Sequence, residues 1–213
     1  MMQHRTILVT GFEPFGGETV NASWEAAKEL DGWRHGDFTA VARLLPCAYE
    51  SSVQKLIHEI ERRRPDALLM AGQAARRSAV CIERFAHNLD DAVAADNDGD
   101  LRRALRISRA APEWLEATAP VTTIVQAIKA AEIPVRASRN AGGFVCNHLY
   151  FGALQYLASQ GLAIPAVFVH LPVTPEQTPP GASAKRMIPA KAAEALRVAA
   201  AVLMGPRKSV EVA

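Results

Sequence analysis

Short, uninterrupted apolar runs are the feature of this sequence that most constrains its fold. They stand at residues 6–10 (TILVT), 67–70 (ALLM) and 166–171 (AVFVHL). Each lacks the alternation of a strand with one solvated face, so each is predicted to be a strand buried on both faces. Segments of helical character separate these runs, and strands joined by crossover helices form parallel sheets. We therefore expect an α/β fold, an α/β/α sandwich around a central, mostly parallel, twisted sheet.

The remaining elements follow from spacing and from turn residues. Further strands are expected at residues 39–45, 80–85 and 135–138, and helices at 23–30, 51–63, 121–128, 145–159 and 189–204. Ser51 and Gln54 form a capping-box pattern, and Gly161 has the place of a C′ glycine. Residues 90–99 are acidic with an Asn-Asp-Gly turn and are expected to form a surface loop, whereas the four prolines in residues 172–180 predict irregular structure. The length, 213 residues, suits one domain spanning residues 1–213.

Composition and charge exclude several classes of protein. The chain has 24 basic and 22 acidic residues, a balance too even for the concentrated basic face of a nucleic-acid-binding protein. No stretch approaches the roughly 18 consecutive apolar residues of a membrane span, and the first residues do not resemble a secretory signal. Three widely spaced cysteines, Cys47, Cys81 and Cys146, form no disulfide framework. We therefore expect a cytoplasmic protein that binds neither nucleic acid nor membranes.

Cys146 is the first candidate for a catalytic residue. It follows the tight Gly142-Gly143 turn and falls at the start of the helix predicted at residues 145–159. There the backbone N–H groups and the helix dipole stabilise a thiolate, and the same N–H groups can form an oxyanion hole. The alternative is a small buried apolar side chain, which is the usual role of a free cysteine. Position alone does not decide between the two.

A base and an orienting carboxylate are available near the ends of predicted strands. His170 ends a buried apolar run, and the carboxyl ends of parallel strands face the ligand crevice, so it is a candidate general base for Cys146; a structural histidine is the alternative. His148 follows Cys146 by two residues on one helix and therefore faces away from it. Glu83 would complete a triad by orienting the imidazole, although its neighbour Arg84 makes a surface ion pair natural.

Four stretches of the sequence together resemble the pyroglutamyl-peptidase I (pyrrolidone-carboxylate peptidase) family of cysteine peptidases. They read TGFEPFGGETVNASWEA, GQAARRSAVCIERFAHN, AGGFVCNH and FVHLPVTPEQ, and the resemblance extends from about Thr6 to the last helix. Each stretch alone is moderately specific. All four in this order, with Cys146 and His170 24 residues apart, are hard to obtain by chance.

The resemblance implies an activity and a set of site residues. The implied activity is removal of N-terminal pyroglutamate from peptides through a thioacyl intermediate, with no metal or organic cofactor; the implied assembly is a homo-oligomer, commonly a tetramer. Nucleophile, base and orienting carboxylate correspond to Cys146, His170 and Glu83. The implied substrate pocket comprises Phe12, Phe15, Asn21, Gln73, Phe144 and Val145.

Such a pocket has a physical logic. Pyroglutamate is an uncharged cyclic residue, so its site should be apolar and flat-walled, with a few polar groups for the lactam N–H and C=O. Phe12 and Phe15, which correspond to the family's ring-sandwiching phenylalanines, would supply the walls, and groups near Gln73 and Phe144 the hydrogen bonds. A site built to bond the lactam rejects proline, because its own polar groups would be left unpaired.

The chain departs from the family pattern at several positions outside the triad. Ala75-Arg76 replaces glycines, Arg139-Asn140 replaces a more usual Asn-Thr pair, and Val93 stands where an arginine near the active site is often found. Cys81 and His87 are also unusual at their positions. A binding protein that has kept the pocket and lost the chemistry is therefore one alternative.

Two further alternatives involve different chemistry. A nucleosidase or phosphorylase of related architecture needs a phosphate or ribose site, and the sequence has no Gly-rich phosphate loop. A zinc protein is disfavoured because the Cys-x-His spacing has no paired Cys-x-x-Cys. Its ligands would come from Cys81, His87, Cys146 and His148.

Overall fold

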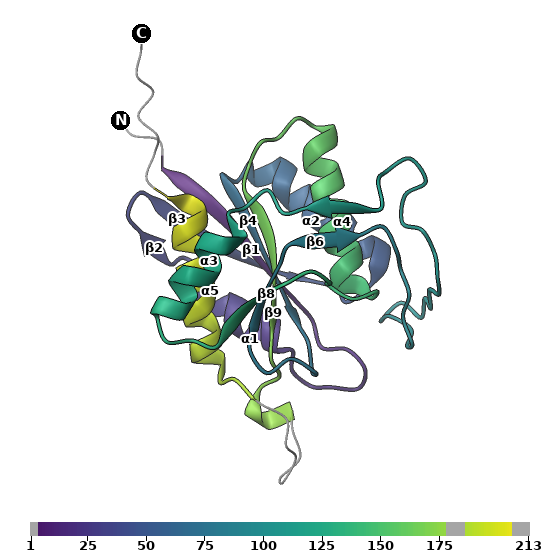
Figure 1. Cartoon of the computed structure of the whole chain (residues 1–213), viewed down its shortest axis with the longest axis horizontal. Helices are drawn as coiled ribbons and strands as arrows, with labels where there is room; N and C mark the ends of the chain where they lie inside the picture. Colours follow the sequence, from purple (N-terminus) through teal and green to yellow (C-terminus); the bar gives the residue numbers. More distant parts are fainter. Residues whose placement is uncertain (1–3, 178–185, 206–213) are drawn as a thin grey trace.

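The computed structural model describes residues 4–177 and 186–205. Its centre is a seven-stranded sheet with strand order β2-β3-β1-β4-β9-β5-β8 (Figure 1). These strands are β1 (Arg5–Phe12), β2 (Arg34–His35), β3 (Phe38–Leu45), β4 (Ala67–Gln73), β5 (Val80–Glu83), β8 (Val135–Ser138) and β9 (Ala166–Leu171). A second, two-stranded sheet pairs β6 (Phe85–His87) with β7 (Trp114–Glu116).

Most strands of the large sheet run in parallel, as predicted. β1 pairs in parallel with β3 and β4, β4 with β9, and β5 with β8. The exceptions are β2 against β3 and β5 against β9, which are antiparallel. The reversal at β5 places Cys81 opposite His170 and Glu83 opposite Phe168. Because side chains alternate between faces with a period of two, Glu83 and His170 are diagonal neighbours on one face.

Helices cover both faces of the sheet, so the predicted α/β/α sandwich is confirmed. Figure 1 shows α1, α3 and α5 on one side and α2 and α4 on the other. Along β1, Ile7 and Val9 pack into the core beneath α1, α3 and α5, whereas Leu8 and Phe12 pack into the core beneath α2 and α4. The helices are α1 (Ala22–Ala27), α2 (Tyr49–Arg63), α3 (Val121–Ala130), α4 (Val145–Ser159) and α5 (Pro189–Met204), with 3₁₀ turns η1 (Lys28–Leu30) and η2 (Pro175–Gln177).

The N-terminus of α2 differs from the prediction. The helix begins at Tyr49 rather than Ser51, and its own N-cap residue makes no side-chain hydrogen bond. A carboxylate oxygen of the distant Asp96 accepts a hydrogen bond from the Tyr49 N–H at 2.8 Å instead. Ser51 donates to Asp98 at 3.2 Å, so the predicted capping box with Gln54 is wrong. A long-range carboxylate satisfies the free helix N–H group in place of a local hydroxyl.

The acidic segment 90–99 is more than a surface loop. Asp90 and Asp96 are buried, with exposed fractions of 1% and 8%, because they bind helix N–H groups and cationic partners in place of water. The predicted turn is present: Gly99 has a φ of +85°, a conformation that favours glycine.

Other local predictions have mixed outcomes. Gly161, with a φ of +63°, follows the C-cap residue of α4 as predicted. Strands β2, β6 and β7 were missed, since elements of two or three residues are too short to show a hydrophobic periodicity. In the segment predicted to be irregular, residues 175–177 form η2, and 178–180 lie outside the described residues. None of the helices described here is long and apolar enough to cross a bilayer.

Candidate active site

The first turn of α4 presents Cys146 together with two free backbone N–H groups. Phe144 is the N-cap residue, and its carbonyl accepts from the N–H groups of Asn147 and His148 at 3.0 and 3.2 Å. The N–H groups of Val145 and Cys146 precede these bonds and, within the described parts of the chain, donate to no other residue. Two donors at the positive end of the helix are therefore available to an oxyanion.

The environment of Cys146 favours the protonated thiol. Burial raises the pKa of the Cys146 thiol well above its ordinary value, and the neighbouring Cys47 and Glu83 raise it further. The sequence predicts a thiolate stabilised by the helix N-terminus, but burial outweighs that effect in the folded chain. A base must therefore take the thiol proton during attack.

A buried carboxylate holds the imidazole of His170. Glu83 is fully buried at the end of β5, and its Oε1 lies 2.9 Å from Nδ1 of His170 on β9. With Nδ1 donating to the carboxylate, Nε2 is the acceptor of the neutral ring. The alternative of a surface ion pair between Glu83 and Arg84 is wrong, because Arg84 contacts Glu116 at 3.4 Å.

Arg77 supports the same carboxylate, a role that the sequence analysis missed. Its Nη2 lies 3.5 Å from Glu83 Oε1 and also donates to Ser138 Oγ at 3.3 Å and to the Asn140 carbonyl at 2.9 Å. The guanidinium thereby ties the end of β5 to the turn that precedes α4. Glu83 Oε2 is buried without a hydrogen-bond partner in the described residues. The contacts of Oε1 with His170 and Arg77 therefore have to offset the free-energy cost of burying the carboxylate.

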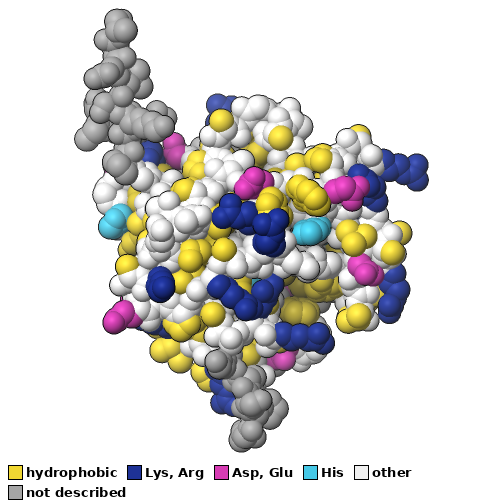
Figure 2. Space-filling model, viewed as in Figure 1, with side chains coloured by type: hydrophobic (Ala, Val, Ile, Leu, Met, Phe, Trp, Pro, Cys, Tyr) yellow, Lys and Arg dark blue, Asp and Glu magenta, His cyan; other side chains and the backbone are white. Residues whose placement is uncertain are grey.

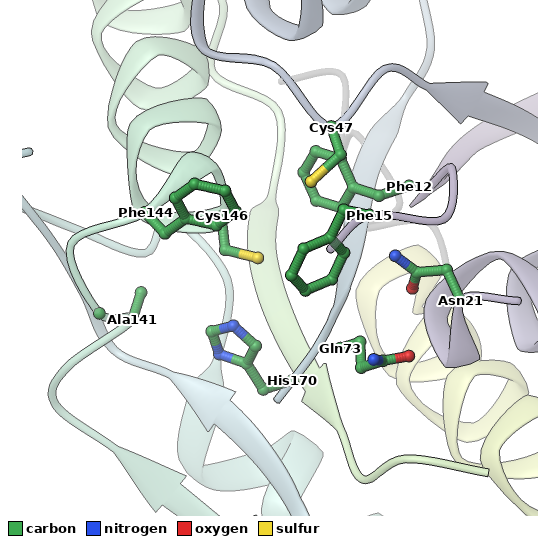
Figure 3. A pocket seen from close by; sticks show the side chains of 10 residues that line it. Phe12, Phe15, Asn21, Cys47, Gln73, Ala141, Phe144, Cys146 and His170 are labelled. Carbon is green, nitrogen blue, oxygen red and sulfur yellow. The ribbon is translucent and has the colours of Figure 1, made fainter. Parts of the chain in front are cut away.

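Cys146 and His170 line one small cavity of about 120 Å³. Figure 3 shows the sulfur and the imidazole facing this space from α4 and β9, with the Phe15 ring beside them. Its volume is far below the ~300–1,000 Å³ of clefts that take drug-sized molecules, so it suits a single small ring. The lining residues are Phe12, Phe15, Asn21, Cys47, Gln73, Ala141, Gly142, Phe144, Cys146 and His170.

Five of the six predicted pocket residues therefore lie together, and one does not. The side chain of Val145 is fully buried in the core between the sheet and α2 and α4, so only its backbone N–H is available to a ligand. Cys47, Ala141 and Gly142 line the cavity although the sequence analysis did not select them. They come from loops whose approach depends on the fold, and no motif marks them.

The cavity is apolar, with few available polar groups. The rings of Phe15 and Phe144 lie 5.8 Å apart. Asn21 is the N-cap of α1: its Oδ1 accepts from Ser23 and its Nδ2 donates to the Glu13 carbonyl. Gln73 Oε1 accepts from the Ala22 N–H at 2.8 Å, while its side-chain NH₂ has no hydrogen-bond partner in the part of the chain described. Gln73 therefore offers a donor to a ligand, whereas Asn21 shapes the loop.

A glycine makes room for the sulfur of Cys146. Gly72 lies on β4, paired with His170 of β9. A Cβ at this position would lie 2.8 Å from Cys146 Sγ and 2.6 Å from a ring carbon of Phe168. Only glycine allows β4 to approach the sulfur so closely.

The other candidate residues point elsewhere. His148 contacts Asp90 through Nδ1 at 2.8 Å and does not line the cavity, which agrees with the prediction that it faces away from Cys146. Cys81 is buried, and Arg136 Nε lies 3.3 Å from its sulfur. Within residues 4–177 and 186–205, no three His, Cys, Asp or Glu side chains form a group that could hold a metal ion.

The fold and the site define a class of protein. A thiol, an imidazole and a buried carboxylate beside two free backbone N–H groups are the parts of a cysteine-dependent acyl-transfer site. The class here is thus that of cysteine hydrolases built on an α/β/α sandwich.

Comparison with known proteins places the chain within that class. The family model described as pyroglutamyl peptidase matches residues 5–205. A pyrrolidone-carboxylate peptidase from Cupriavidus necator is 37% identical over 207 residues, covering 97% of this chain and 96% of that protein. One from Gloeobacter violaceus is 44% identical over 171 residues, covering 80% and 83%. The chain belongs to the pyroglutamyl peptidase family.

Solved structures agree with this assignment. The crystal structure of pyroglutamyl peptidase I from Bacillus amyloliquefaciens superposes with a TM-score of 0.92 at 36% identity, covering 99% of this chain and all of that one. A pyrrolidone carboxyl peptidase mutant from the hyperthermophile Pyrococcus furiosus gives a TM-score of 0.89 at 34% identity, covering 93% and 98%. The predicted fold class is confirmed over nearly the whole chain.

Proposed function

We propose that this protein is a cysteine exopeptidase that hydrolyses the amide bond following an N-terminal pyroglutamyl residue. Cys146 is the nucleophile, His170 the general base and acid, and Glu83 the residue that orients His170. The observation that carries the proposal is the 2.9 Å contact between Glu83 and His170 beside the small apolar cavity that His170 shares with Cys146. Family membership supports the same reaction.

Acylation begins with attack of Cys146 Sγ on the pyroglutamyl carbonyl carbon, while the thiol proton passes to Nε2 of His170. The carbonyl oxygen becomes an oxyanion, and the N–H groups of Val145 and Cys146 are placed to donate to it. Glu83 stabilises the imidazolium that forms. His170 then gives its proton to the leaving amine as the C–N bond breaks, which leaves a thioester on Cys146.

Deacylation reverses these roles. A water molecule attacks the thioester carbonyl and transfers a proton to His170, and the same two backbone N–H groups stabilise the second oxyanion. The C–S bond breaks, His170 returns a proton to the sulfur, and free pyroglutamate leaves. Every proton acquired by His170 is returned within the cycle, and the residues already present supply each step.

Selectivity for the lactam follows from the cavity. Phe12 and Phe15, together with Phe144, offer apolar walls, and the side-chain NH₂ of Gln73 is a donor for the lactam carbonyl. A prolyl ring fits the same space but leaves that donor unpaired, a kind of mismatch that costs up to about 10⁴–10⁵-fold in kcat/KM. In this proposal Asn21 acts by shaping the loop that carries Phe15, and Val145 acts through its N–H.

The cellular setting is part of the proposal. Cys47, Cys81 and Cys146 are all free thiols, which suits a reducing compartment such as the cytoplasm. The proposal also includes a single catalytic domain that spans the chain. It further includes a homo-oligomer, a tetramer by resemblance, whose mass light scattering of the purified protein measures.

Hydrolysis of a fluorogenic pyroglutamyl amide, with the prolyl amide as control, tests the function. Cys146→Ser is expected to lower kcat/KM by at least about 10⁴-fold, and Glu83→Gln by less, about 10²–10³-fold, since an orienting group is partly replaceable. Cys81→Ser is the matched control, because that thiol lies outside the cavity, and it is expected to keep its rate. An active Cys146→Ser enzyme would exclude this nucleophile, and an inactive, folded, reduced wild type would favour the alternative of a pyroglutamyl-binding protein.

A further inference from the structure

Arginine side chains gather on one face of the molecule. Figure 2 shows a group of Lys and Arg side chains over the region of β8 and β6. Four arginines lie on the segment that follows β4, on β8 and on the turn after β8. They are called the mouth arginines here: Arg76, Arg77, Arg136 and Arg139. With a net charge of only +2 for the whole chain, this is a local concentration of positive charge.

Three of the mouth arginines contact neighbouring segments. Arg77 donates to the carbonyl of Asn140, the residue after Arg139, at 2.9 Å. The Arg139 guanidinium lies 4.9 Å from the centre of the Phe85 ring. Arg136 Nε lies 3.3 Å from Cys81 Sγ, on the same face of the sheet as His170.

Two of the four have no polar side-chain partner among the described residues. Arg76 and Arg139 are exposed, and among the described residues neither forms an ion pair with a carboxylate. Arg77, by contrast, lies 3.5 Å from Glu83 and belongs to the catalytic support. Arg136 is exposed as well, but its Nε contacts Cys81 Sγ. The guanidinium groups without a polar side-chain partner are therefore those of Arg76 and Arg139.

Two of the mouth arginines lie close in sequence to residues that line the cavity. His170 gives its proton to the leaving amine, and Arg77 and His170 contact the same Glu83 oxygen. Arg76 follows Gln73 by three residues and Arg139 precedes Ala141 by two, and both Gln73 and Ala141 line the cavity. A pyroglutamyl residue has nothing before it in the peptide, so the substrate outside the cavity is the leaving group alone.

We propose that Arg76 and Arg139 bind a carboxylate of the leaving peptide, so that this enzyme prefers pyroglutamyl peptides with a negative charge just after the scissile bond. The proposal rests on the proposed function. The carboxylate comes either from an acidic side chain or from the free C-terminus of a very short peptide. Planar guanidinium groups match carboxylates in both cases. Because the arginines are exposed, each contributes modestly and the preference is sensitive to salt.

Matched substrates measure this preference and separate its two sources. Pyroglutamyl-glutamate amide and pyroglutamyl-glutamine amide differ only in the side-chain charge, and pyroglutamyl-alanine with a free or amidated C-terminus differs only in the terminal charge. With two exposed pairs contributing, kcat/KM is expected to be about fivefold higher for a charged member at about 0.01 M salt and nearly equal at about 1 M salt. A preference in one pair only identifies the source of the carboxylate.

Variants locate the effect. Arg76→Gln combined with Arg139→Gln is expected to abolish the preference while leaving the rate on the neutral amides unchanged. Lys55→Gln with Lys129→Gln removes the same charge at exposed positions on α2 and α3, and should keep the preference. Equal rates for charged and neutral substrates in the wild type, or a preference that survives the double arginine variant, would overturn the proposal. Failure to cleave the neutral amides would instead refute the proposed function, and this inference with it.

Discussion

Replacing Gly72 with alanine tests how closely β4 packs against the sulfur of Cys146. The added Cβ would lie 2.8 Å from Cys146 Sγ and 2.6 Å from Phe168 Cζ, whereas non-bonded heavy atoms settle at about 3.5–4.0 Å. The sulfur or the strand must therefore move by about 0.7–1.2 Å. A displacement of about 1 Å costs about 10²-fold in rate, and overpacking of this kind costs about 1–3 kcal/mol of stability.

The assay compares kcat/KM on a pyroglutamyl amide with the thermal unfolding midpoint. Gly152→Ala is the matched control, because it adds the same methyl group on α4, the helix that carries Cys146. There the new Cβ would lie 3.1 Å from the methyl carbons of Val53, a side chain that can yield, and alanine favours helix by up to about 1 kcal/mol over glycine. Gly152→Ala is expected to keep its activity and its stability.

Two results would refute this reasoning. One is a folded Gly72→Ala enzyme with the wild-type kcat/KM, since the sulfur would then tolerate the intrusion. The other is an equal loss of activity in Gly152→Ala, which would show that any added volume in this layer is damaging. A drop in rate with an intact near-ultraviolet circular dichroism spectrum is the predicted outcome, because the change acts on the position of one atom.

Two predictions concern the thiols and pH. Since burial raises the pKa of Cys146, the rate of its alkylation by iodoacetamide should increase continuously between about pH 6 and pH 9; a rate independent of pH would reveal a preformed thiolate. Burial, Glu13 and Asp96 raise the pKa of Cys47 from 9.0 to about 12, so the native state holds its proton more tightly than the unfolded chain. The resulting stability, at most about 4 kcal/mol, is fully present below about pH 9 and is lost as pH rises toward about 12. Cys47→Ala should therefore show a shallower decline of unfolding free energy over this alkaline range in urea titrations. An unchanged decline would contradict the raised pKa of Cys47 as its cause.

The buried strands could be predicted from the sequence because burial on both faces leaves a direct trace. The runs at residues 6–10, 67–70 and 166–171 became β1, β4 and β9, the neighbours β1-β4-β9 at the centre of the sheet. The bounds of β9 are as predicted, whereas β1 continues to Phe12 and β4 to Gln73. Phe12 and Gln73, the last residues of these strands, line the pocket. Gly11, Gly72 and Gln73 interrupt the apolar pattern of the two runs.

Helix starts were harder to predict, since distant residues decide them. The Asp96 carboxylate binds the N–H of Tyr49 at the start of α2, and the two residues are 47 positions apart. A local pattern such as Ser51 with Gln54 competes with that contact and loses, because the carboxylate is buried and must find donors.

The sequence by itself determined the fold class and the chemical parts of the site. Apolar runs specify a buried sheet, and a thiol at a helix start and a histidine near a strand end are local facts. Only the tertiary structure decided how these parts work together. The reversal of β5 brings Glu83 beside His170, burial keeps the Cys146 thiol protonated, and Arg77 reaches from another loop to the same carboxylate. Strand direction, desolvation and contacts between distant loops depend on the whole packed chain, so no local pattern of residues encodes them.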